Sequence, residues 1–151
     1  MTDTQVCSKC GAVLPEGATC ETNFHQMLFW EAEEPTRGVV HHLMVLCYHL
    51  QHPSLYSPDG LANGIQLLTS FVRDGISPAE IRRTMSDKVN SKNRQWKVTA
   101  RPDSKGIYAH PVVWTMRAAD VVARGVDHYV DSVREWAQSV YNVLQASENL
   151  T

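Results

Sequence analysis

Residues 126–144, VDHYVDSVREWAQSVYNVL, decide the fold class of this chain. Their large apolar side chains recur at three- and four-residue spacings over about five turns, a period that places them on one face of an α-helix. The opposite face carries Asp127, Asp131, Glu135 and Gln138. The pattern therefore predicts a long amphipathic helix, and with it a mainly α fold.

The rest of the chain also has helical patterns. Serine followed by proline marks two helix starts, at Ser57 and Ser77, because serine caps a helix and proline suits its first position. Pro53 and Gly75 mark two ends. A bundle of about four to six helices is expected, with the further helices over residues 19–34, 36–51, 58–74, 78–90 and 116–124.

Length and composition are those of one globular domain. The 151 residues are 43% apolar and 20% charged, a balance that excludes global disorder. We expect a single domain, made of a metal-binding loop over residues 1–19 and a helical bundle over 20–151. No run approaches the roughly 20 apolar residues of a membrane helix. The first residues also show no secretory signal, so we expect a soluble, cytoplasmic protein that does not enter a membrane.

Basic residues are concentrated in the middle of the chain. Residues 80–106 contain Trp96 and a run of Lys and Arg, and such a segment can hold a nucleic-acid backbone and stack a base. A solvated helix face followed by a polar loop is the favoured interpretation, because the whole chain has a pI of about 6.4. The basic residues are Arg82, Arg83, Lys88, Lys92, Arg94, Lys97, Arg101 and Lys105.

The motif Cys7-Ser8-Lys9-Cys10-Gly11 carries the most specific chemistry. Two residues between the cysteines let both sulfurs reach one tetrahedral ion, and the glycine permits a left-handed turn whose N–H groups point at sulfur. A redox pair of this spacing normally lies between a strand and a helix of an α/β pattern, which is not seen here. The motif predicts a zinc knuckle.

Zinc needs two more ligands, and Cys20 is the natural third. Nine residues separate it from Cys10, a loop that closes easily. Its place at the start of the first helix also favours a thiolate. Cys47 lies in the middle of the second helix beside Leu46, and we interpret it as a small buried hydrophobic residue.

The fourth ligand is expected from one of the seven histidines. His41 and His52 share a face of the second helix but are about 16 Å apart along its axis, so both cannot bind one ion. His41 is the first choice because it lies near the helix start; His52 is the second, and His42 and His25 follow. Any single histidine can instead be a satisfied core or surface residue. The expected metal ligands are Cys7, Cys10, Cys20 and His41.

These motifs resemble those of a bacterial family of domains of unknown function. The shared pattern runs from Cys7-x-x-Cys10-Gly11 through Cys20-x-x-x-Phe24 and His41 to Gln51-His52-Pro53, and residues 133–140 are also similar. The resemblance covers most of the chain, supports the motif set and implies no activity. The family is expected to have an acidic residue where this chain has Leu46, so any role of that carboxylate is lost or moved here.

Two classes of function remain open from the sequence. Three cysteines on one zinc are typical of a closed structural site, and function would then lie in a surface that binds a second copy of the chain or another protein. The rival is a metal-dependent hydrolase or transferase with an open metal position, similar to the DinB-like four-helix metalloproteins, in which His41, His49 and His128 would converge. No H-E-x-x-H, Gly-rich phosphate loop or G-x-S-x-G motif occurs. We favour structural zinc in a protein-interaction module and assign no catalytic residue.

Overall fold

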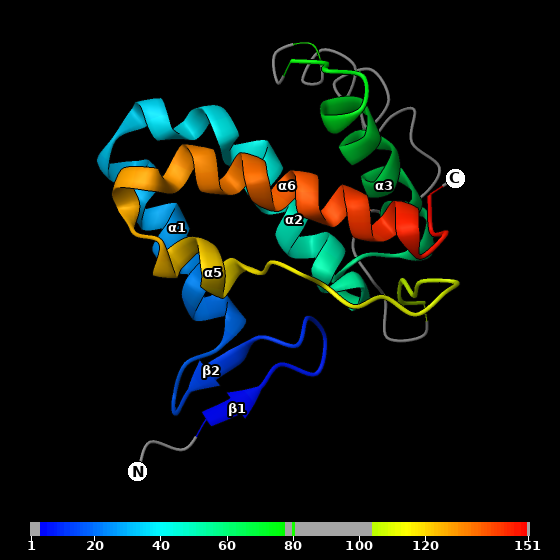
Figure 1. The fold of residues 1–151 in the computed structure, drawn as a ribbon, viewed down its shortest axis with the longest axis horizontal. Helices are drawn as coiled ribbons and strands as arrows, with labels where there is room; N and C mark the ends of the chain where they lie inside the picture. The colour runs from blue at the N-terminus through cyan, green and yellow to red at the C-terminus, as the bar shows by residue number, and fades with distance from the viewer. Residues whose placement is uncertain (1–3, 78–79, 81–103, 151) are drawn as a thin grey trace.

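The computed structural model describes residues 4–77, Glu80 and residues 104–150 (Figure 1). This part of the chain is mainly helical and contains a single sheet of two antiparallel strands. The expected mainly α class is confirmed. Within the same residues, none of the helices combines the length and the apolar character needed to cross a membrane.

The described chain begins with a β-hairpin. Strand β1 (Thr4–Val6) pairs with strand β2 (Val13–Pro15) in the register Val6↔Val13. The sequence predicts only a compact loop here, because strands of three residues are too short to produce a recognisable alternation. The cysteine motif forms the turn between the two strands.

Helix α1 (Cys20–Glu33) begins where the sequence predicts. The Thr19 side chain accepts a hydrogen bond from the backbone N–H of Thr22, and the Thr22 side chain accepts one from the backbone N–H of Thr19. One helix is predicted over residues 36–51, but the structure has a 3₁₀ helix (Pro35–Val40) followed by helix α2 (His41–Gln51). The 3₁₀ segment contains a glycine and two β-branched valines. These residues have low α-helix propensity, which accounts for its tighter winding.

Helix α3 (Pro58–Val72) has the expected cap and stop. The N–H of Gly60 donates to the Ser57 side chain at 2.9 Å, and Gly75 has a positive φ of 66°. The N–H of Glu80 likewise donates to the Ser77 side chain at 3.2 Å. The helix expected over residues 78–90, and most of the basic segment over 80–106, lie outside the described residues.

The C-terminal helices form the centre of the bundle. Helix α5 (Ala118–Ala123) is followed by a 3₁₀ helix (Val126–His128) and helix α6 (Tyr129–Ala146). Helix α6 lies across α2 and also packs on α3 and α5, while α5 lies beside α1 (Figure 1). The apolar face predicted for α6 is fully buried at Val133, Trp136, Val140 and Leu144.

Truncating Leu144 to alanine should lower the free energy of unfolding by about 2–5 kcal/mol, because the side chain is fully buried and its removal leaves a cavity. The matched change Leu55→Ala removes a side chain that is 44% exposed, and it should cost less than about 1 kcal/mol. Urea unfolding followed by circular dichroism measures both. Equal losses for the two variants would contradict the described packing of α6.

Candidate metal centre

Three thiols and one imidazole converge where the hairpin meets α1 and α2. The ligand atoms of Cys7, Cys10, Cys20 and His52 all lie within 4.8 Å of one another. Cys7 and Cys10 come from the hairpin turn, Cys20 is the first residue of α1, and His52 directly follows α2. Cys7 is half-buried and the other three are buried. Segments far apart in the sequence therefore contribute to one shielded group.

Two of the spacings within the group are close to those of tetrahedral coordination. Two sulfurs bound to one zinc ion at about 2.3 Å lie about 3.8 Å apart, and a bound sulfur and imidazole nitrogen lie about 3.6 Å apart. The sulfurs of Cys10 and Cys20 are 3.5 Å apart, and the Cys7 sulfur is 3.7 Å from Nε2 of His52. The donor set and its dimensions can hold one metal ion.

The hairpin turn, residues 7–12, is held in shape by its own backbone and by Arg117, the residue before α5. The N–H of Cys7 donates to the carbonyl of Ala12, and the N–H of Gly11 donates to the carbonyl of Cys7, both at 2.9 Å. Gly11 has a φ of 79°, which a residue without a side chain adopts at little cost. The side chain of Arg117, before α5, donates to the carbonyl of Cys10 at 2.7 Å. This hydrogen bond connects the turn to the start of α5.

His52 presents Nε2 to the sulfurs because its other ring nitrogen is occupied. Nδ1 donates to the carbonyl of Tyr48 at 2.7 Å, and this bond fixes the tautomer whose Nε2 is free to coordinate. The imidazole stacks on the Tyr48 ring at 4.4 Å, and Tyr48 lies against Phe24 at 4.6 Å. Burial lowers the pKa of His52, so the ring is in the neutral form that a metal requires.

The residues beside His52 fix the end of α2. Gln51 is fully buried, and its side-chain amide donates to the carbonyl of Met116 at 2.7 Å. Pro53 opens a short 3₁₀ turn (Pro53–Leu55) and cannot continue the helix. The Gln-His-Pro sequence therefore anchors the helix end, supplies a potential ligand and turns the chain away.

The cysteine thiols perturb one another. Burial raises the pKa of Cys10, and burial together with the sulfur of Cys10 raises the pKa of Cys20. Burial also acts to raise the pKa of Cys7, but hydrogen bonds from the backbone N–H groups of Cys10 and Lys9 and from the thiols of Cys20 and Cys10 together leave this pKa below its ordinary value. Protons therefore stay on Cys10 and Cys20 unless a cation replaces them.

The structure brings three of the four predicted ligands together and places the fourth, His41, elsewhere. His41 begins α2 and His52 follows its last residue, so the helix holds them about 16 Å apart. The end of α2 that meets the cysteines is the C-terminal one. Nδ1 of His41 instead lies 2.6 Å from a carboxylate oxygen of Glu31. The imidazole that lies with the three cysteines is that of His52, and the signal for it in the sequence is the helix-ending proline that follows.

The remaining candidates lie away from the cysteines. Cys47 is fully buried, as expected of a small hydrophobic residue. His25 is exposed and lies 3.7 Å from Glu21. Among the described residues, no group of three potential metal ligands contains His25, His41, His42, His49 or His128.

Replacing Cys20 by serine should abolish metal binding, because it removes one of the four potential ligand atoms. The matched variant Cys47→Ser changes a buried cysteine that lies outside the group. We expect one equivalent of metal in the unmodified chain and in Cys47→Ser, and less than a tenth of that in Cys20→Ser. Elemental analysis of protein purified under reducing conditions measures this. Metal retained by Cys20→Ser would show that the cysteines are not the ligands.

Metal affinity should rise with pH between pH 6 and 8. Protons stay on Cys10 and Cys20 in the metal-free protein because their pKa values are raised, so binding must release them. His52 adds no such requirement, because its pKa is lowered and the ring is already neutral. Competition with a chromophoric chelator should show a release of at least two protons per ion. An affinity that is independent of pH would contradict thiol coordination.

The comparisons with known proteins give one positive result. No curated protein and no solved structure matches the chain. A family of unknown function, DUF5946, matches residues 5–145, which include all four members of the group. This confirms the resemblance drawn from the cysteine and Gln-His-Pro motifs. The chain belongs to the family of unknown function DUF5946.

Proposed function

We propose that Cys7, Cys10, Cys20 and His52 bind one zinc ion and that this ion is structural. Three thiolates and an imidazole are a donor set typical of Zn²⁺, which accepts sulfur and nitrogen in a tetrahedral arrangement. Calcium and magnesium instead require oxygen ligands. The convergence of the four ligand atoms within 4.8 Å is the observation that supports this proposal most strongly.

A closed site favours structure over catalysis. A catalytic zinc ion has three protein ligands and leaves its fourth position to water or substrate. Here four protein side chains would complete the shell, and three of them are buried. No carboxylate among the described residues belongs to the group, so a general base for a zinc-bound water is missing there.

The ion would hold the hairpin on the bundle. A sheet of two three-residue strands is not stable alone in water. Leu14 of β2 is buried at 4% exposed, but its neighbours Val6 and Val13 are 65% and 64% exposed, so the strands contribute little apolar burial of their own. Zinc bound by the turn, α1 and the end of α2 would therefore supply the free energy that orders the hairpin.

The ordered hairpin supports a role in protein interaction. Val6 and Val13 are direct partners across the two strands and both are exposed. A rigid pair of apolar side chains suits contact with another protein or a second copy of the chain. Reduced thiols are required for zinc binding, so a cytoplasmic location fits the proposal.

Zinc removal should destabilise the protein strongly. Treatment with a chelator, or the change His52→Ala, should lower the melting temperature by roughly 8–16 °C, which corresponds to about 4 kcal/mol in a chain of this size. His41→Ala is the matched histidine change and should retain one zinc ion. His52→Cys should also retain it, because four cysteines hold zinc well. An unchanged melting temperature after complete removal of zinc would contradict a structural role.

A further inference from the structure

A second group of polar side chains lies at the opposite end of α2 from the cysteines. The side chain of Glu31, on α1, is only 8% exposed. One carboxylate oxygen lies 2.6 Å from Nδ1 of His41, and the other accepts a hydrogen bond from the hydroxyl of Tyr129 on α6. A buried carboxylate that is bonded through both oxygens has a fixed orientation. It therefore fixes the His41 ring as well.

The proton positions in this group follow from its partners. Burial raises the pKa of Tyr129, and the hydrogen bond to Glu31 raises it further, so the hydroxyl stays protonated and donates. Glu31 then accepts from both neighbours, which places a proton on Nδ1 of His41. In the neutral ring Nε2 carries the free lone pair. The His41 side chain is 43% exposed, and among the described residues Nε2 has no hydrogen-bond partner.

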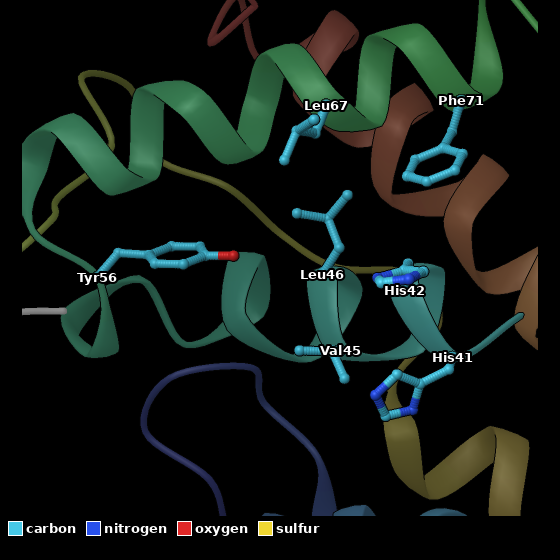
Figure 2. A pocket seen from close by; sticks show the side chains of 7 residues that line it. All are labelled: His41, His42, Val45, Leu46, Tyr56, Leu67 and Phe71. Atoms are coloured by element: carbon cyan, nitrogen blue, oxygen red, sulfur yellow. The ribbon is translucent and has the colours of Figure 1, made fainter. Parts of the chain in front are cut away.

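A pocket of about 140 Å³ lies beside His41, between α2 and α3. Figure 2 shows His41 on the same side of α2 as Val45, with Tyr56 at the far end and Phe71 of α3 above. The rings of His41 and His42 meet edge to face at 5.8 Å at one end of this largely apolar space, and the hydroxyl group of Tyr56 points inward from the other end (Figure 2). An apolar cavity of about 150 Å³ accommodates one benzene molecule. The pocket therefore has room for a single six-membered ring.

The lining also restricts the charge of a ligand. No Lys, Arg, Asp or Glu lines the pocket within the described residues. A charged molecule would lose part of its hydration there without gaining a counter-charge from such a residue, and this is unfavourable. A neutral molecule with a hydroxyl group meets no such penalty, because Nε2 of His41 can accept its proton in a hydrogen bond. The carboxylate behind the imidazole strengthens that acceptor.

We infer that this pocket binds a small neutral molecule about the size of one aromatic ring, whose hydroxyl group donates to Nε2 of His41. Glu31 and Tyr129 are positioning residues that hold the imidazole in the accepting tautomer. The site is separate from the cysteines and does not depend on the identity of the bound metal.

Titration of the metal-loaded protein with three probes tests this inference by NMR. Phenol carries a ring and a hydroxyl, toluene has a similar size but no donor, and benzoate is charged. We expect saturable binding of phenol with a shift of the His41 Nε2 resonance, at least tenfold weaker binding of toluene, and no binding of benzoate. Equal affinities for phenol and toluene, tighter binding of benzoate, or no binding of any probe would overturn the inference.

Variants separate the roles of the pocket and of His41. His41→Leu should abolish the preference for phenol over toluene while toluene still binds, which shows that the pocket is intact. Glu31→Gln should weaken phenol binding severalfold and alter the His41 tautomer in the ¹⁵N spectrum. His25→Leu changes an exposed histidine outside the pocket and should leave both affinities unchanged. A preference for phenol that survives in His41→Leu would overturn the assignment of Nε2.

Discussion

Cysteine sulfurs that lie within a few ångströms of one another cannot all be thiolates unless a cation lies between them, and this constraint governs one end of the molecule. The sulfurs of Cys7, Cys10 and Cys20 and Nε2 of His52 fit within 4.8 Å. As protonated thiols they would make only weak hydrogen bonds. As ligands of one ion they would join the hairpin, α1 and α2 by strong bonds. The short hairpin has few other anchors, namely the buried side chain of Leu14 and the bond from Arg117 to the carbonyl of Cys10, while its paired valines face solvent.

Helix α2 connects the two polar groups of the molecule. Its C-terminal end is fixed by the buried side chain of Gln51 and by the stack of Phe24, Tyr48 and His52. Its N-terminal end carries His41, which Glu31 holds from α1. Because α2 lies under α6 and beside α3 (Figure 1), an ion that fixes one end of the helix would also stabilise the wall of the pocket at the other.

The parts of the fold that could be predicted from the sequence are those with local signals. The period of α6, the serine cap of α3, the glycine at residue 75 and the cysteine spacing are all of this kind. The hairpin could not be predicted, because strands of three residues leave no pattern. The sequence could not decide whether His41 or His52 lies with the cysteines, because this depends on which end of α2 packs on them. The contact of Tyr129 with Glu31 joins residues 98 positions apart and has no local signal either.

X-ray absorption at the zinc edge of the purified protein shows which side chains bind the ion. We expect a first shell of three sulfurs at about 2.3 Å and one nitrogen at about 2.0 Å, with the outer-shell scattering of an imidazole ring. A shell with two sulfurs and two light atoms, or a spectrum without the imidazole signature, would contradict this expectation.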